Sequence, residues 1–150
     1  MKPYLYFAAP LFSEAELVFN QSLAEELERT FNVYLPQRDG CLVVDLVRNF
    51  GIPWSEASSE VFERDIAAIR RCDLFLAVLD GRAPDEGLSF ELGFACAIEK
   101  PCWGLKTDPR TLLEYGMNPM LFGGLEVVFD SRAALVNAAK KWAKEFDSVG

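Results

Sequence analysis

The sequence contains no histidine. This absence excludes Ser-His-Asp and Cys-His catalysis, histidine-ligated metals and acid–base chemistry by an imidazole. If the chain is an enzyme, carboxylates, tyrosine, lysine or cysteine must transfer the protons. The sequence also lacks a Gly-x-Gly-x-x-Gly motif and a P-loop, which bind dinucleotides and nucleoside triphosphates. We therefore expect neither a metal nor a cofactor.

Cysteine is present only at four separated positions, and no pair has the Cys-x-x-Cys spacing of a zinc or redox motif. No apolar run approaches the roughly 20 residues that are needed to cross a bilayer. No secretory leader is visible at the start of the chain. We expect a cytoplasmic protein with reduced thiols.

Basic residues are also scarce, with 15 Lys and Arg against 23 Asp and Glu, for a net charge of −8. This balance argues against a nucleic-acid polymer or an anionic membrane as the partner. The length of 150 residues and the hydrophobic content of 51% fit one domain, residues 1–150, with one substantial core.

Short apolar runs alternate with amphipathic segments along the chain. The apolar runs predict five strands, at residues 4–8, 31–35, 73–79, 102–105 and 126–129. The amphipathic segments predict helices at residues 14–29, 56–71, 87–99 and 131–146. Residues 42–50 form either a short helix or a loop, and residues 106–124 form a long polar loop.

The helix signals are specific at two N-termini. Ser13 and Glu16 have the spacing of a capping box, and Ser131 is placed to cap the last helix. In the helix at 56–71, Phe62 and Ile69 are expected to face inward.

Strands that alternate with helices indicate the α/β class. We predict a single-domain, flavodoxin-like (Rossmann-like) three-layer sandwich with a five-stranded parallel sheet of order 2-1-3-4-5. Ligands of such sheets bind beyond the carboxyl ends of the strands, at the switch point between strands 1 and 3. This rule selects three loops: residues 9–13, residues 80–88 and the turn after the fourth strand.

The segment after the third strand carries two carboxylates, Asp85 and Glu91. Glu91 follows one turn into the predicted helix, whose N-terminus favours an ionised carboxylate and hence a nucleophile. Asp85 can face the same cleft, and Gly87 permits close approach of a ligand. Two carboxylates above a sheet edge suit glycosyl chemistry. The alternative is that these acidic residues only stabilise the first turn of the helix.

Several other residues have competing interpretations. Tyr6 near the end of the first strand could orient Glu91, or it could be an ordinary core tyrosine. Asp65 alone, within a regular helix, is typical of a solvated surface. Ser89 is not a nucleophile elbow, because the second glycine and a histidine are missing. Asp80 ends the third strand as in a receiver domain, but the acidic residues that should follow the first strand are absent.

Matching segments are spread over most of the chain: residues 4–12, 35–37, Asp65, 85–93, 100–101 and 118–120. With these residues the sequence resembles the nucleoside 2-deoxyribosyltransferase family. The resemblance implies that Glu91 attacks C1′ of a 2′-deoxynucleoside and forms a covalent deoxyribosyl ester. It implies that Tyr6 positions Glu91 and that Asp85 binds a sugar hydroxyl. Asp65 would lie on the base side as the proton donor to the leaving base, a role that Asp85 could also fill.

The resemblance also implies substrate-binding residues. Asn118 would hold the 5′-hydroxyl in a neighbouring subunit's site, with Met120 beside it. Gln37 and Asp39 would read the base edge, and Phe12 would stack on the base. The chain would then form a homo-oligomer, either a dimer or a hexamer built from dimers.

The function that follows is transfer of 2-deoxyribose between a 2′-deoxynucleoside and a free nucleobase, in nucleoside salvage. Such chemistry needs no histidine, because a 2′-deoxysugar forms its oxocarbenium-like transition state readily and one positioned carboxylate plus an acid suffices. Alternatives are a nucleoside or 5′-nucleotide N-glycosidase, with water as acceptor, and a non-catalytic nucleoside-binding module. The apolar loop at residues 8–12 is a poor phosphate cradle, which favours nucleosides over nucleotides.

Overall fold

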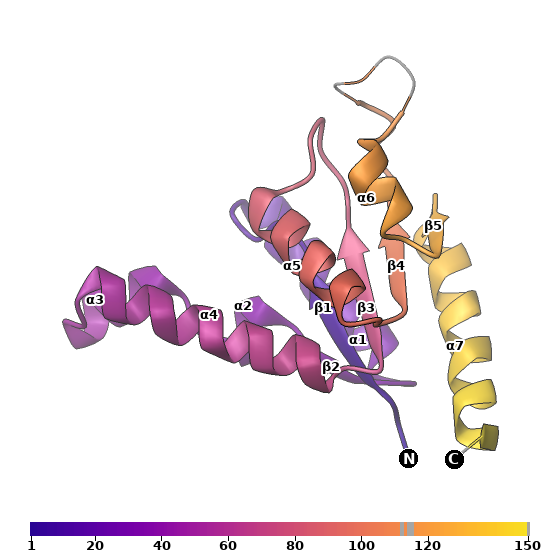
Figure 1. The fold of residues 1–150 in the computed structure, drawn as a ribbon, viewed down its shortest axis with the longest axis horizontal. Coiled ribbons are helices and arrows are strands. Elements are labelled where there is room, and N and C mark those ends of the chain that lie inside the picture. The colour runs from indigo at the N-terminus through magenta and orange to yellow at the C-terminus, as the bar shows by residue number, and fades with distance from the viewer. Residues whose placement is uncertain (112, 114–115, 150) are drawn as a thin grey trace.

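A parallel five-stranded sheet forms the centre of the molecule. The computed structural model describes residues 1–111, 113 and 116–149. The strands are β1 (Tyr4–Ala8), β2 (Asn32–Tyr34), β3 (Leu74–Val78), β4 (Cys102–Leu105) and β5 (Val127–Phe129). Their order is β2-β1-β3-β4-β5, and every neighbouring pair is parallel. The predicted fold class and strand order are therefore confirmed (Figure 1).

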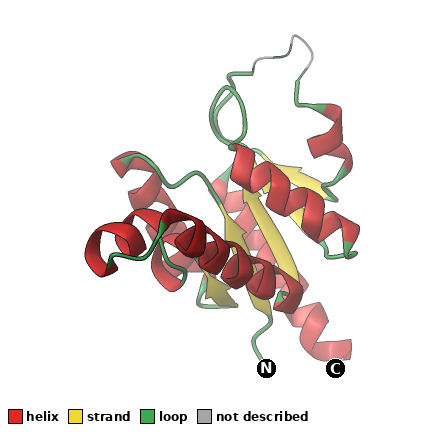
Figure 2. Ribbon diagram, turned by 60° about the vertical axis from the view of Figure 1, so that its left-hand side comes forward, coloured by secondary structure: helices red, strands yellow, loops and turns green. Residues whose placement is uncertain are grey.

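Helices cover both faces of this sheet (Figures 1 and 2). On one face lie α1 (Glu14–Leu27) and α7 (Arg132–Val149), and on the other lie α4 (Trp54–Arg71) and α5 (Glu86–Ala97). The shorter helices are α2 (Pro36–Asp39), α3 (Val43–Phe50) and α6 (Pro119–Gly123). None of the helices in the described residues is long and apolar enough to cross a membrane.

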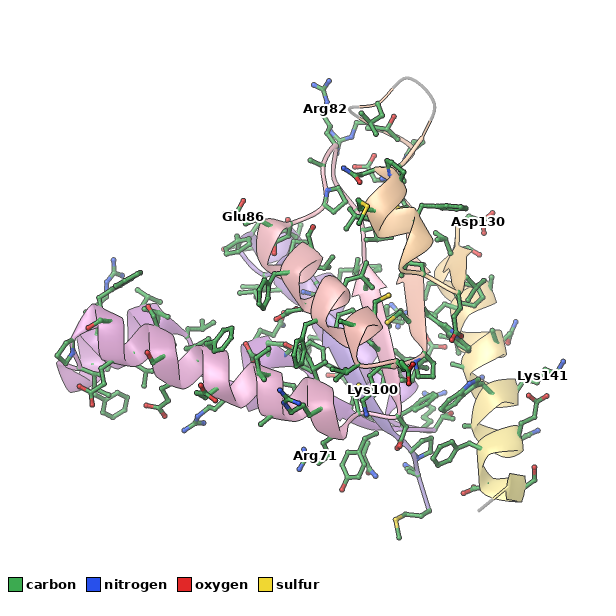
Figure 3. All side chains as sticks on the ribbon, in the orientation of Figure 1. Arg71, Arg82, Glu86, Lys100, Asp130 and Lys141 are labelled. Carbon is green, nitrogen blue, oxygen red and sulfur yellow. The ribbon has the colours of Figure 1, made fainter. Side chains whose placement is uncertain are left out.

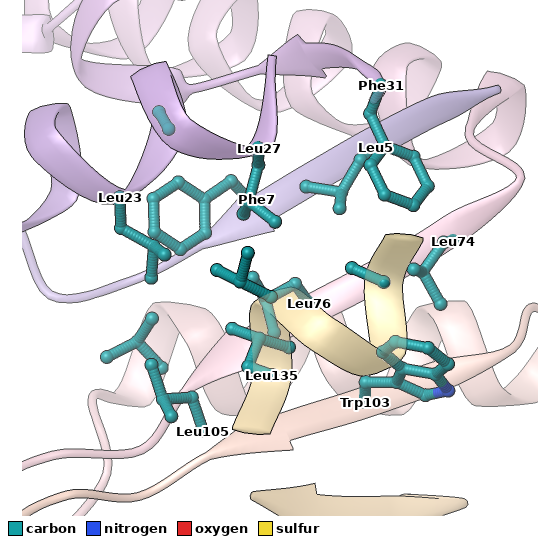
Figure 4. Packing of buried hydrophobic residues seen from close by; sticks show 14 of the residues in the cluster. Leu5, Phe7, Leu23, Leu27, Phe31, Leu74, Leu76, Trp103, Leu105 and Leu135 are labelled. Atoms are coloured by element: carbon teal, nitrogen blue, oxygen red, sulfur yellow. The ribbon is translucent and has the colours of Figure 1, made fainter. Parts of the chain in front are cut away.

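Side chains alternate along β1 and so divide the core into two layers. Leu5 and Phe7 pack in the layer that faces α1 and α7, together with Trp103 of β4 (Figure 4). Tyr6 and Ala8 face the opposite way, toward α4 and α5. Because successive strand residues point to opposite sides, this register sends Tyr6 toward the helix that carries Glu91.

The predicted helix caps are present. Ser13 accepts a hydrogen bond from the amide of Glu16, whose carboxylate accepts one from the Ser13 amide, which completes the capping box. Ser131 accepts from the amide of Ala134 at the start of α7. Residues 43–50 form a helix rather than a loop.

Two short helices were not predicted. One is α2, which begins at Pro36, and the other is α6, which begins at Pro119 inside the stretch predicted as a polar loop. Proline is favoured at the first position of a helix because its missing amide hydrogen would be unpaired there. Pro36 and Pro119 thus both start helices.

The prediction that Phe62 faces inward is wrong. Its side chain is 49% exposed and packs against Phe90 of α5, which is 57% exposed, with ring centroids 6.0 Å apart. The buried residues of α4 lie mainly near its C-terminus, where Ala68 and Ile69 meet the sheet. The N-terminal part of α4 extends away from the sheet with α3 beside it (Figure 1). The apolar side chains of this part of the helix therefore do not pack on the strands.

Candidate active site

A cleft of about 590 Å³ opens beyond the carboxyl ends of β1 and β3, where the topology predicts a ligand site. Its lining residues are Ala9, Leu11, Phe12, Pro36, Cys41, Leu42, Val43, Val44, Val61, Asp65, Asp85, Gly87, Leu88 and Glu91. Most of this lining is apolar. Three acidic residues, Asp65, Asp85 and Glu91, belong to the lining. The described lining residues include no lysine or arginine.

Tyr6 and Glu91 meet beside this cleft. The Tyr6 hydroxyl donates a hydrogen bond to Oε1 of Glu91 over 2.7 Å. The Tyr6 ring is fully buried and stacks between the rings of Tyr34 and Phe75, at centroid distances of 5.5 and 5.4 Å. Because the two neighbouring rings restrict its rotation, the hydroxyl is held toward the carboxylate.

Burial raises the pKa of Glu91 to about 7. The Tyr6 hydrogen bond lowers this pKa, while the nearby charges of Asp65 and Asp85 raise it further. The expectation that the helix N-terminus keeps Glu91 ionised is therefore wrong. Glu91 is the sixth residue of α5 and lies in its second turn, and the helix dipole acts mainly within the first turn. The carboxylate is thus close to half-ionised at neutral pH.

Burial and these neighbouring acidic groups also raise the pKa of Tyr6 far above its ordinary value. The Tyr6 hydroxyl therefore remains protonated at any physiological pH and acts as a hydrogen-bond donor to Glu91. It does not act as a base.

A second tyrosine–carboxylate pair lies next to the first. Tyr34 donates a hydrogen bond to Oδ1 of Asp65 over 3.0 Å. Asp65 is half-buried on α4 and lines the cleft, so its interpretation as a solvated surface residue is wrong. Burial raises the pKa of Asp65, and the Tyr34 hydrogen bond and the Arg64 charge partly oppose that shift.

Asp85 lines the cleft and also caps α5. Its Oδ1 accepts a hydrogen bond from the amide of Leu88 over 2.9 Å. A Cβ atom at Gly87 would lie 3.1 Å from this oxygen, so glycine leaves room for the cap. The next residue, Glu86, is exposed and points away from the fold (Figure 3). Of the three acidic residues on this segment, Asp85 and Glu91 line the cleft and Glu86 does not.

Phe12 also lines the cleft, and its side chain is 77% exposed at the rim. Gln37 and Asp39 are not part of the lining. The Gln37 amide accepts a hydrogen bond from Asn20, and Asp39 accepts one from the Leu35 amide and pairs with Arg38. Both predicted base readers are occupied by contacts within the protein.

Asn118 and Met120 lie apart from this cleft. Asn118 caps α6 by accepting a hydrogen bond from the Met120 amide, and it lines a separate cavity of about 270 Å³ with Arg82 and Lys106. Met120 is 83% exposed. The structure thus does not bring these two residues to Glu91 within one chain, and their place in a neighbouring subunit's site stays a prediction.

Neither Tyr34 nor the apolar wall from Cys41 to Val44 was predicted from the sequence. Tyr34 pairs in register with Tyr6 across the two parallel strands, so both rings point to the same face of the sheet. Tyr6 lies in the middle of β1 and Tyr34 at the end of β2. A tyrosine in each of two adjacent strands was the signal that could have located Tyr34. Within the described residues, no group of three or more acidic or cysteine side chains is arranged to hold a metal ion.

The model of a family described as nucleoside 2-deoxyribosyltransferase matches residues 5–142. No curated protein matches the chain.

Among the solved structures that share the fold are the following three. A conserved protein from Enterococcus faecalis V583 has a TM-score of 0.80 and 26% identity, with 94% of this chain and 99% of that chain covered. A 2-deoxyribosyltransferase from Bacillus psychrosaccharolyticus has a TM-score of 0.72 and 21% identity, with 89% and 90% covered. A CMP N-glycosidase from Clostridium botulinum has a TM-score of 0.52 and 16% identity, with 90% and 96% covered.

Proposed function

Since the chain belongs to the nucleoside 2-deoxyribosyltransferase family, we propose that it transfers a 2-deoxyribosyl group between nucleobases through a covalent bond to Glu91. The observation that carries this proposal is the 2.7 Å hydrogen bond from Tyr6 to Glu91 at the apolar cleft. The bond occupies Oε1 of Glu91 and leaves Oε2 as the oxygen that attacks the sugar. A positioned carboxylate with a second acid nearby is the arrangement that a retaining glycosyl transfer needs.

In the first step, Oε2 of Glu91 forms a bond to C1′ of a 2′-deoxynucleoside. The C1′–N bond breaks, and its electron pair leaves with the base. Asp65, whose pKa is raised by burial, donates the proton that neutralises the leaving base. The products are the free base and a deoxyribosyl ester of Glu91.

In the second step, a ring nitrogen of another base attacks C1′ of the ester from the opposite face. The ester C1′–O bond breaks, and Glu91 recovers its carboxylate. The proton of the incoming base returns to Asp65, which restores the starting state. Two successive inversions at C1′ give net retention of configuration.

The remaining cleft residues fit the two ends of a nucleoside. We assign Asp85 to a sugar hydroxyl, because one of its oxygens caps α5 and the other is available to the cleft. Phe12 and the apolar wall from Cys41 to Val44 would pack against the base. The described lining carries no lysine or arginine, which favours a neutral nucleoside over a 5′-phosphorylated one.

The proposal includes a second copy of the chain. Asn118 and the exposed Met120 would reach the 5′-end of the substrate in a neighbouring subunit's site, and the assembly would be a dimer or a hexamer. Mixing inactive Glu91→Ala and Asn118→Ala chains tests this. If sites are shared, mixed assemblies contain some intact sites and regain activity, whereas sites within single chains regain none.

A second candidate is hydrolysis, in which water replaces the acceptor base. The chain shares its fold with a CMP N-glycosidase, and this is the observation that makes hydrolysis the second candidate. The attack of water on the Glu91 ester would release free deoxyribose, with the same first step and the same residues.

A chromatographic assay separates these reactions. The protein is incubated with 2′-deoxyinosine alone, with added adenine and with added cytosine, and then with thymidine as the donor. A new deoxynucleoside that forms only when a base is added supports the transferase. Base release at the same rate without acceptor supports the hydrolase.

Glu91→Ala should abolish turnover in either reaction. Glu86→Ala is the matched control, because it removes an exposed carboxylate from the same helix. A wild-type protein with no turnover on either donor, or a Glu91→Ala variant with full turnover, would contradict the proposal.

A further inference from the structure

Tyr34 has no part in the two reaction steps above, yet its hydroxyl contacts an acid that does. It lies at the carboxyl end of β2 and donates to Oδ1 of Asp65 over 3.0 Å. Its ring stacks on the ring of Tyr6 at 5.5 Å between centroids and 18° between planes. Tyr34 therefore links the Asp65 carboxylate to the tyrosine that holds Glu91.

The local backbone keeps the Tyr34 hydroxyl in this place. A Cβ atom at Gly40 would lie 3.2 Å from the hydroxyl oxygen and 2.7 Å from the carbonyl oxygen of Pro36. The chain after α2 thus passes close to the hydroxyl, and only glycine fits there without a shift. With the backbone on one side and Asp65 on the other, the hydroxyl has little room to turn away.

We propose that Tyr34 is a positioning residue of the transfer reaction, which fixes the Asp65 carboxylate so that its second oxygen exchanges the proton with the base. The Tyr34 hydroxyl occupies Oδ1, so Oδ2 is the oxygen that remains for the proton. Tyr6 does the same for Glu91, where it occupies Oε1 and leaves Oε2. This inference rests on the proposed function.

The stack of Phe75, Tyr6 and Tyr34 couples the two pairs. Both tyrosine rings are held by their neighbours at 5.4 to 5.5 Å. Each hydroxyl is fixed to its ring and bonded to one carboxylate. The stack therefore also sets the distance between Glu91, which would bond to the sugar, and Asp65, which would protonate the base. Accurate separation of reacting groups is a large source of rate enhancement in enzymes.

The hydrogen bond also acts on the ionisation of Asp65. A donor to an ionised carboxylate favours the charged form, so the bond from Tyr34 lowers a pKa that burial raises. The titratable or charged groups that interact with Asp65 from the surrounding elements are Arg64, Cys41, Tyr6, Tyr34 and Glu91. Removing the Tyr34 hydroxyl should move the Asp65 pKa upward, and the limb of the pH profile that depends on Asp65 should move with it.

Tyr34→Phe tests the proposal, because it keeps the ring stack and removes only the hydroxyl. We expect kcat to fall by roughly 10- to 100-fold, the effect of losing one hydrogen bond to a charged group. KM should change little, and the basic limb of the kcat profile should move to higher pH. Tyr4→Phe is the matched control, since Tyr4 lies on β1 outside the cleft and should leave kcat unchanged.

A double-mutant cycle shows whether Tyr34 acts through Asp65. In an Asp65→Asn background, Tyr34→Phe should cause little further loss of kcat. An equal loss in both backgrounds, or wild-type kcat and an unshifted pH profile in Tyr34→Phe, overturns the inference and leaves the proposed function intact. A wild-type protein that turns over no deoxynucleoside overturns both.

A spectroscopic measurement separates positioning from loss of folding. The ¹³C carboxyl signal of Asp65, assigned with Asp65→Asn, should titrate at higher pH in Tyr34→Phe than in the wild type. An unchanged midpoint would contradict the inference, because a purely structural role leaves that titration in place.

Discussion

The hydroxyl of Tyr6 on β1 donates a 2.7 Å hydrogen bond to Glu91 on α5, although 85 positions separate the two residues in the chain. The parallel sheet joins them. β1 and β3 are hydrogen-bonded neighbours, and α5 follows the loop after β3 and packs on the face to which Tyr6 points. A half-buried acid with a pKa of about 7 and a permanently protonated donor result from this packing.

Removing the Tyr6 hydroxyl should impair the nucleophile without unfolding the protein. In Tyr6→Phe the ring can still stack between Tyr34 and Phe75, but Glu91 loses a bond that lowers its pKa. We expect kcat/KM to fall by roughly 10- to 100-fold. The acidic limb, which lies near pH 7 in the wild type, should move to higher pH. Rate–pH profiles measure both effects, and an acidic limb unmoved by the substitution would contradict the assignment.

The sequence predicts the framework of this site well. The five strands, their order and the helices that flank them follow from hydrophobic periodicity and from the caps at Ser13 and Ser131, because these signals are local. The run at 73–79 is almost continuously apolar, which is typical of a strand covered on both faces, and β3 is buried throughout.

The contacts within the site were less predictable. The hydrogen bond between Tyr34 and Asp65 spans 31 positions and depends on which faces two elements present to each other. Asp65 alone is indistinguishable from a surface residue in the sequence. The pKa of Glu91 was expected in the wrong direction, since burial cannot be deduced from a position near a helix start.

Replacing Glu91 should stabilise the protein at alkaline pH. The pKa of this group is about 7 in the folded chain and 4.5 as its ordinary value, so the folded state binds the proton more tightly. Its contribution to stability is therefore present below pH 4.5 and is lost as the pH rises through 7. Glu91→Gln cannot ionise, so it should gain about 3 kcal/mol over the wild type at pH 8 and almost nothing at pH 4.5.

Urea unfolding at the two pH values measures this difference. A gain at pH 8 that equals the gain at pH 4.5 would mean that ionisation of Glu91 is not the cause. In that case the site would lower the free energy of unfolding through other residues.

Asp85 should have two separable roles. Asp85→Asn keeps a good N-cap for α5 but removes the charge, whereas Asp85→Ala removes the cap as well. We expect both variants to lose turnover, with the alanine variant alone losing about 1 kcal/mol of stability. Thermal unfolding together with the transfer assay distinguishes the roles. Full activity in Asp85→Ala would show that the residue is only a helix cap.

Glu99 offers a test away from the site. It follows the C-cap residue of α5 and has a φ of 59°, and the Lys100 amide next to it donates a hydrogen bond to the Ala95 carbonyl. Glycine adopts this left-handed conformation without steric cost. Glu99→Gly should therefore stabilise the protein by about 0.5–1 kcal/mol in chemical denaturation and leave turnover unchanged. Destabilisation would show that the Glu99 side chain makes a contribution larger than the backbone strain.

The most direct test of covalent transfer through Glu91 is the mass of the protein quenched in acid during turnover of 2′-deoxyinosine. We expect part of the protein to gain the mass of one deoxyribosyl group, peptide mapping to place this group on Glu91, and added adenine to remove it. A deoxyribosyl group on another residue, or a protein that turns over substrate with a mass that never changes under rapid quenching, would contradict this mechanism.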